Sequence, residues 1–128
     1  MITMTLNDIF NAAPALREIS NKEFPGSITF KIARIIRELD KEIQLFEAER
    51  EKIAYKYGEK DDNGMLVVLE GGNIKIPDEN ITECNNELQA LFNTEVEINA
   101  SKLPLSIFET IEMTPTQAMN LEALVDFE

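Results

Sequence analysis

Four oxygen-bearing side chains between residues 59 and 70 are spaced almost as in a twelve-residue calcium-binding loop. They are Glu59, Asp61, Asn63 and Glu70. Gly64 lies where such loops bend sharply. Two features differ from a calcium loop: the first ligand is glutamate in place of the shorter aspartate, and Gly71-Gly72 with a β-prone run follows in place of a helix. We therefore favour a solvent-exposed turn, and we expect no metal or other cofactor.

Three glutamates recur every four residues further along the chain, at Glu79, Glu83 and Glu87. On a helix they would form a column with a rise of about 6 Å between successive carboxylates. Such a column imitates a row of phosphates and could bind the basic groove of a nucleic-acid-binding protein. Glu95 and Glu97 follow closely and would enlarge the patch. The alternative interpretation is a solvated helix face that keeps the protein soluble.

The residue types that most catalytic sites need are rare in this chain. It has no histidine and one cysteine, so a serine–histidine pair and a Cys/His zinc site are excluded. That cysteine, Cys84, falls on the apolar stripe of a predicted helix and is expected to be a small core residue. No glycine-rich phosphate loop occurs, and no pair of carboxylates is marked out for acid–base chemistry. These observations predict a protein that is not an enzyme.

The net negative charge of the chain is confined to its second part. Residues 1–57 contain nine acidic and nine basic residues, whereas residues 58–128 contain fifteen acidic residues and three lysines. The formal net charge of −12 disfavours direct binding to nucleic acid or to an anionic membrane, and it favours encounter with basic protein surfaces. No apolar stretch approaches the ~20 residues that span a bilayer, and the N-terminus lacks a signal pattern, so we expect a cytoplasmic location.

The strongest periodic signal predicts a long amphipathic helix over residues 27–57. Apolar side chains recur there at alternating steps of three and four residues. They are Ile28, Ile32, Ile35, Leu39, Ile43, Phe46, Ile53 and Tyr57. Ser27 can cap the start of this helix, and Gly58 follows its end. The outer face mixes both charge signs, as at Arg37 and Glu38, and is interpreted as solvated.

A shorter helix is predicted from about Asn80 to Phe92. Asn80 and Glu83 resemble a capping box, and an apolar heptad-like repeat follows. Before this helix, the β-prone runs 65–69 and 73–76 flank a glycine-rich turn and predict a β-hairpin. The shorter helix is therefore expected to pack back along the longer one.

The ends of the chain carry further signals. A short strand is predicted at Ile2–Met4, and the alternation of Val96 and Ile98 predicts a strand that could pair with it. Thr5 can cap a following helix, in which Pro14 is expected to weaken or split the regular turns.

The segment Thr114-Pro115-Thr116-Gln117 combines a cap, a proline at the first helical position and a glutamine at the third, and so predicts a C-terminal helix. Together these elements predict one α+β domain over residues 1–128. It would contain a long antiparallel helical hairpin with a β-hairpin at its connection, a small antiparallel sheet built from the β-hairpin and the termini, and the C-terminal helix closing the core. An apolar seam on the distal half of the long helix would favour a homo-oligomer.

Four segments resemble, in the same order, segments of small acidic proteins of unassigned function that phages and prophages of low-GC Gram-positive bacteria encode. They are Lys31-Ile32-Ala33-Arg34, the Phe46–Tyr57 stretch continuing through Gly58-Glu59-Lys60-Asp61, Asn85-Asn86-Glu87-Leu88, and Asn93-Thr94-Glu95-Val96-Glu97-Ile98. The layout resembles that group over most of the chain. The resemblance implies a phage setting, and it implies no functional residues.

From the charge distribution, the missing chemistry and this resemblance, we expect a non-enzymatic protein-binding factor that acts in the cytoplasm of an infected bacterium. Its anionic surface would bind a basic surface of a host defence or nucleic-acid-handling protein and inhibit that protein. The alternative is an accessory of virion structure or assembly, in a tail or head, that oligomerises through its helical hairpin. Partners would be proteins, with no direct binding to nucleic acid or membrane.

Overall fold

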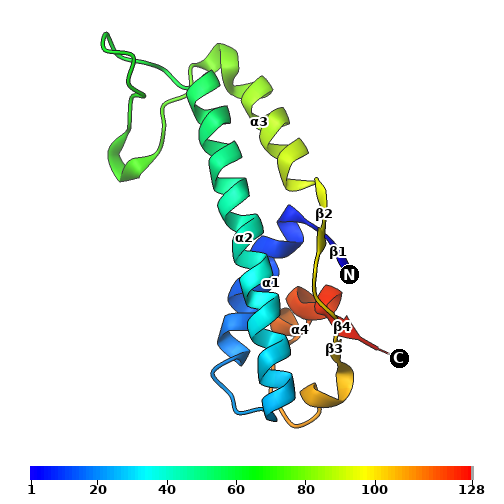
Figure 1. Cartoon of the computed structure of the whole chain (residues 1–128). Coiled ribbons are helices and arrows are strands. Elements are labelled where there is room, and N and C mark those ends of the chain that lie inside the picture. The colour runs from blue at the N-terminus through cyan, green and yellow to red at the C-terminus, as the bar shows by residue number, and fades with distance from the viewer. Residues whose placement is uncertain (128) are drawn as a thin grey trace. The chain divides into compact units, whose positions relative to one another are not determined.

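The computed structural model describes residues 1–127 and divides the chain into two compact units. The first unit comprises Met1–Gln44 and the chain from Thr94 onward, and the second unit comprises Leu45–Asn93. The chain folds into helices and short strands and contains one long helix, which confirms the predicted mixture of α and β structure (Figure 1). The single domain expected over the whole chain stays a prediction.

In the first unit, strand β1 (Ile2–Thr5) pairs antiparallel with strand β2 (Glu95–Ile98), which confirms the predicted pairing. The register sets Ile2 opposite Ile98. Both of these side chains are buried, as is Met4, because alternate residues of a strand point to the same face. The short sheet therefore has an apolar face toward the core of this unit.

A second pair of strands also lies in the first unit. Strand β3 (Leu103–Pro104) pairs parallel with strand β4 (Val125–Asp126). The prediction of one antiparallel sheet built from the β-hairpin and both termini was therefore wrong. Leu103 and Val125 are buried where the strands pair. The burial of these two side chains therefore favours the pairing of β4 with β3.

Helix α1 (Leu6–Ile19) begins at the capping box that the sequence predicts. Thr5 Oγ1 accepts a hydrogen bond from the Asp8 amide, and the Asp8 carboxylate accepts one from the Thr5 amide, both at 3.1 Å. The helix continues through Pro14, so the possible split into two helices does not occur. Proline inside a helix costs about 3 kcal/mol, and the burial of neighbours such as Leu16 offsets this cost.

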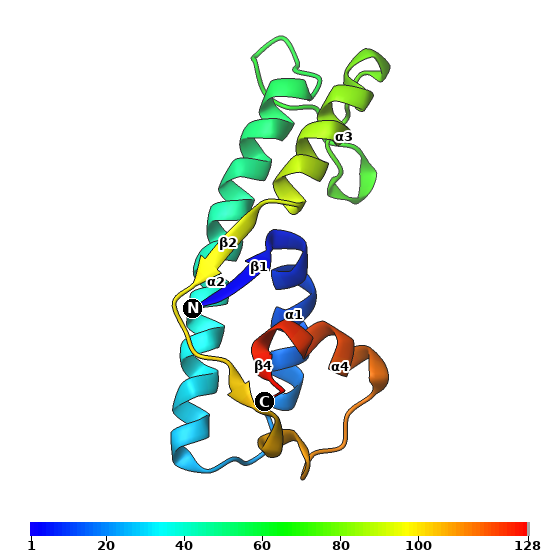
Figure 2. The same cartoon turned by 90° about the vertical axis from the view of Figure 1, so that its right-hand side faces the viewer.

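Helix α2 (Gly26–Tyr57) is the long helix, and it ends at the residue predicted. Its residues 26–44 belong to the first unit, where Ile35 and Leu39 are fully buried. Figure 2 shows α1 beside α4 (Pro115–Leu121), and these two helices are in contact.

Helix α4 opens with the predicted capping box between Thr114 and Gln117. It is shorter than expected. A 3-10 turn over Glu122–Leu124 follows it and leads into β4, with Leu124 fully buried. Burial of this last segment against the core ends the regular helix earlier than its apolar period suggests.

In the second unit, residues 45–57 of α2 pack against α3 (Asp78–Phe92). The ring centroids of Phe46 and Phe92 lie 4.9 Å apart. At the other end of the pair, the Asn80 side-chain amide donates to the Tyr57 carbonyl oxygen at 3.1 Å. The end of α2 thus meets the start of α3, as in antiparallel packing.

The predicted capping role of Asn80 was wrong. Helix α3 begins two residues earlier, at Asp78. The capping position is occupied by Pro77, which forms no side-chain capping hydrogen bond. Asn80 lies inside the helix and uses its side chain to bond the end of α2. A contact with a segment more than twenty residues away therefore replaces the local cap.

The connection between α2 and α3 is a loop with isolated bridges, so the two strands predicted at 65–69 and 73–76 do not form as regular strands (Figure 1). A single antiparallel bridge joins Lys60 to Leu66, and a second one joins Val68 to Ile74, which flank a 3-10 turn over Glu70–Gly72. Val68 is 58% exposed, and two short segments without a covering layer bury too little to hold a regular ladder.

Gly58 is the point at which this loop leaves α2, and only glycine fits there. A Cβ atom at this position would lie 2.6 Å from the Ala54 carbonyl oxygen and 2.7 Å from a methyl group of Leu66. Both distances are shorter than any ordinary carbon contact. Glycine is therefore needed for the close approach of the loop to the end of the helix.

Candidate functional site

The acidic column of α3 begins with two side chains that are free of ion pairs. Glu79 and Glu83 are exposed and one turn apart, and no basic side chain within residues 1–127 pairs with either. Asp78 and Glu79 lie in the first turn, where negative charge also stabilises the helix dipole. These carboxylates can accept hydrogen bonds and ion pairs from a partner without breaking bonds of their own.

Glu87, the third member of the column, is engaged with α2. Its Oε1 accepts hydrogen bonds from Lys56 Nζ and from the Tyr57 hydroxyl, both at 2.9 Å. Both bonds lower the pKa of Glu87 below its ordinary value, and the bond from Lys56 has the larger effect. The same contact with Glu87 raises the pKa values of Lys56 and Tyr57. Glu87 therefore joins the two helices of the second unit.

Glu95 and Glu97, the other predicted binding residues, lie on β2 in the first unit. Both are exposed, and they face Thr5 and Thr3 across the strand pair. Their side chains point away from the core because Ile98, at the alternate position, is buried. They are accessible carboxylates on a strand of the first unit, whereas the column of Glu79, Glu83 and Glu87 belongs to a helix of the second unit.

The segment that resembles a calcium loop is folded as a turn with internal bonds. Asp61 Oδ1 accepts from the amides of Asn63 at 2.9 Å and Met65 at 3.1 Å, an arrangement typical of an Asx turn. Glu59 pairs with Lys75 at 3.0 Å. In the described part of the chain, no three Cys, Asp or Glu side chains, Glu70 included, cluster in a way that could hold a metal ion. This geometry supports the turn interpretation.

Cys84 is 5% exposed in α3. Burial, together with the nearby negative charge of Glu87, raises the pKa of its thiol above the ordinary value. A thiol held in its neutral form is a poor nucleophile. The environment of Cys84 is therefore that of a small core residue.

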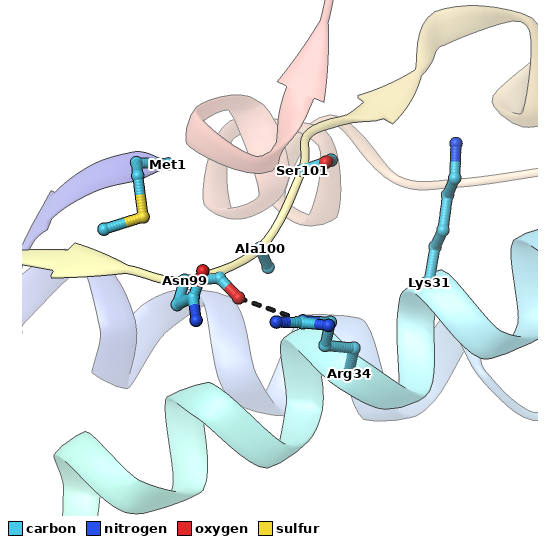
Figure 3. A pocket seen from close by; sticks show the side chains of 6 residues that line it. All are labelled: Met1, Lys31, Arg34, Asn99, Ala100 and Ser101. Carbon is cyan, nitrogen blue, oxygen red and sulfur yellow. Dashed lines mark hydrogen bonds between the residues drawn. The ribbon is translucent and has the colours of Figure 1, made fainter.

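One cavity in the first unit was missed by reasoning from the sequence. It has a volume of about 440 Å³ and is lined by six residues from three segments (Figure 3). They are Met1, Lys31, Arg34, Asn99, Ala100 and Ser101. The two bases lie one turn apart on α2, and their spacing was the only signal in the sequence. The segment with Asn99 and Ser101 is more than sixty residues away along the chain, so a local pattern does not reveal the cavity.

None of the helices within residues 1–127 has the length and apolar character needed to cross a membrane. Comparison of the chain with known protein families, with curated proteins and with solved structures found no match.

Proposed function

We propose that this protein is a non-enzymatic protein-binding factor that uses the acidic face of α3 to bind a basic surface of another protein. The observation that carries the proposal is the exposure of Glu79 and Glu83, one turn apart, with no ion pair of their own in the described chain. The antiparallel packing of α2 and α3 supports the finer proposal of a helical hairpin that presents this face.

The excess of negative charge supports the same function. Residues 58–128 contain fifteen acidic residues against three lysines, so the field of this part steers basic surfaces toward it. Charges at the rim of an interface act mainly on the rate of association and on the choice of partner. Glu87, which is bound to Lys56 and Tyr57, holds the helix that carries the two free carboxylates.

We propose that the setting is the cytoplasm of an infected bacterium, and that binding blocks a host defence or nucleic-acid-handling protein. The resemblance of four segments to small acidic phage proteins supports this setting. Such a partner carries a basic groove, which an acidic helix face complements in charge. The protein would occupy that groove and keep nucleic acid out.

The test is capture of partners from infected-cell lysate by the tagged protein, with a salt series and mass spectrometry. The Glu79→Lys/Glu83→Lys double variant should lose a partner that the wild type holds at low salt and releases at high salt. Glu109→Lys/Glu112→Lys is the matched control, because it makes the same charge change at two exposed positions of the first unit. Partner recovery that neither salt nor the α3 variant changes would contradict the proposal.

Reversal of Glu79 also removes a favourable charge from the first turn of α3. Glu83→Lys alone avoids this effect because Glu83 lies in the next turn. If the single variant has the helix content of the wild type and still binds less partner, the loss belongs to the surface and not to unfolding.

The second candidate is an accessory of virion structure or assembly that oligomerises. Exposed apolar side chains in the second unit favour it, since Leu45 is 62% and Tyr55 56% exposed on α2. Salt distinguishes the two candidates. Copies with a net charge of −12 repel one another, so added salt should strengthen self-association and weaken the binding of a basic partner. Sedimentation of the pure protein across a salt series measures the first effect, and a monomer at all salt concentrations would remove this candidate.

A further inference from the structure

Two basic side chains of α2 lie beside the segment that follows β2, around the cavity of about 440 Å³ (Figure 3). Lys31 and Arg34 extend from the helix, and Asn99 and Ser101 come from the segment opposite. The volume is within the range of small-molecule sites, roughly 300–1,000 Å³. Four polar side chains from two elements thus surround a space that can hold a small ligand.

Arg34 is already oriented in this cavity. Its Nε donates to the Asn99 carbonyl oxygen at 3.0 Å, as the dashed line in Figure 3 marks. This bond ties the guanidinium to the segment after β2 and uses one of its five N–H groups. The remaining donors can serve a ligand, and their direction is set before the ligand arrives.

Neither of these two bases has an acidic partner within residues 1–127. Six basic side chains within residues 1–127 form ion pairs with carboxylates, and neither Lys31 nor Arg34 is among them. Acidic residues outnumber basic ones by 24 to 12. In Figure 3 the guanidinium of Arg34 turns toward Asn99 and the ammonium of Lys31 points away from it, so the two cations leave uncompensated positive charge on two sides of the cavity.

We propose that this cavity binds a small phosphate monoester through its phosphate group. A phosphate monoester carries a charge of about −1.5 to −2 near neutral pH and has three strong acceptor oxygens. The charge matches the two cations, and the oxygens match the donors of the Arg34 guanidinium. The flexible Lys31 side chain must turn toward Arg34 for its ammonium to contact the same phosphate. A carboxylate offers one charge and two oxygens. The net charge of −12 repels an extended polyanion, which is why the ligand is small.

The experiment is a titration of the ¹⁵N-labelled full chain, followed by amide chemical shifts, with methyl phosphate, inorganic phosphate and acetate as probes. Sodium chloride at the same ionic strength is the blank. Methyl phosphate should shift the amides of Asn99, Ala100 and Ser101 in a saturable way. Arg34→Gln and Lys31→Gln should each weaken this binding by roughly tenfold or more, the usual value of a hydrogen bond to a charged group.

Arg37→Gln is the matched control, because it removes the same charge from an exposed position of α2 that does not line the cavity. The Arg37→Gln variant should bind methyl phosphate as tightly as the wild type does. Lys31→Gln leaves the bond between Arg34 and Asn99 in place, so it tests ligand contact without disturbing the segment after β2. Equal weakening by Arg37→Gln would assign the effect to general charge and overturn the site.

The other probes also decide the ligand class. Absence of saturable shifts with methyl phosphate and inorganic phosphate would overturn the proposal. If inorganic phosphate binds and methyl phosphate does not, the proposal of a phosphate ester is overturned and free phosphate is the ligand. Acetate that binds as tightly as methyl phosphate would assign the cavity to carboxylates. Because Glu79 and Glu83 take no part in this cavity, the result is independent of the protein-binding function proposed above.

Discussion

The two units differ in how much apolar surface they bury. Among the described residues, eighteen buried apolar side chains belong to the first unit, and the second unit has three, namely Phe46, Tyr57 and Cys84. The second unit nevertheless holds six of the eleven large apolar side chains that are exposed. A unit with so small a core is expected to open locally at a lower free energy than the first unit.

This difference separates two kinds of surface. The paired strands and buried helices of the first unit support the phosphate cavity on elements whose positions are set by packing. The second unit carries the exposed carboxylates of α3 on a helix held by a few contacts, among them those of Glu87. The cavity is open, because Lys31, Arg34 and Ser101 are exposed, and its lining comes from elements with a buried core beneath them. This arrangement suits a small ligand, whereas an adaptable acidic face suits a protein surface.

The largest expected effect is on the core of the first unit. Leu16 is fully buried in α1, and Leu16→Ala should lower the free energy of unfolding by about 2–5 kcal/mol. Leu88→Ala in α3 should cost less than half as much, because Leu88 is only partly buried. Urea unfolding of both variants measures the comparison. Equal losses would show that the second unit has a core as important as that of the first.

An intermediate effect is expected at the start of the loop in the second unit. Gly58→Ala places a methyl group against the Ala54 carbonyl oxygen, and overpacking of this kind costs about 1–3 kcal/mol. Gly26→Ala is the control, since a Cβ atom there meets nothing within 4 Å. Hydrogen exchange should show faster exchange in α3 for Gly58→Ala only, with α1 unchanged. Faster exchange throughout α1 would mean that the two units open together.

The smallest expected effect is a change in pH dependence. The pKa of Glu87 is lowered in the folded protein by its bonds to Lys56 and Tyr57, so its contribution to stability is present above the ordinary glutamate range. That contribution is lost as the pH falls through the lowered folded-state pKa. Wild type and Glu87→Gln should therefore differ in stability near neutral pH and converge in acid.

Urea unfolding between neutral and acidic pH measures this convergence. Glu83→Gln is the control, because Glu83 has no ion pair within residues 1–127, so this substitution removes a charge from α3 without removing a bond between the two helices. A gap between wild type and Glu87→Gln that persists into acid would show that hydrogen bonding, and not ionisation, joins the two helices.

Local signals in the sequence predicted local features well. The caps at Thr5 and Thr114 and the helix end at Gly58 were found because a cap, its partner and the helix start lie within a few residues. The pairing of β1 with β2 was found because alternation marks which face of a strand is buried. Where the prediction was wrong, at Asn80 and in residues 65–76, tertiary surroundings overrode the local preference.

The candidate binding residues divide in the same way. Their spacing along α3 was readable, and so was the exposure expected of Glu79 and Glu83. That Glu87 is bound to Lys56 was not readable, because the two residues are 31 positions apart. A helix period says which residues share a face, and it does not say what that face meets.

The sequence by itself determined the charge of this protein, the separation of that charge along the chain, the long helix, and the caps at Thr5 and Thr114. These features depend on residue type and on neighbours within one or two turns. The cap expected at Ser27 was wrong, because the long helix begins at Gly26 and Ser27 lies inside it. The tertiary structure alone decided that Lys31 and Arg34 meet the segment around Asn99, and how the buried side chains divide between the two units. Such contacts join segments far apart in the chain, and packing of the whole core selects them over the many local alternatives.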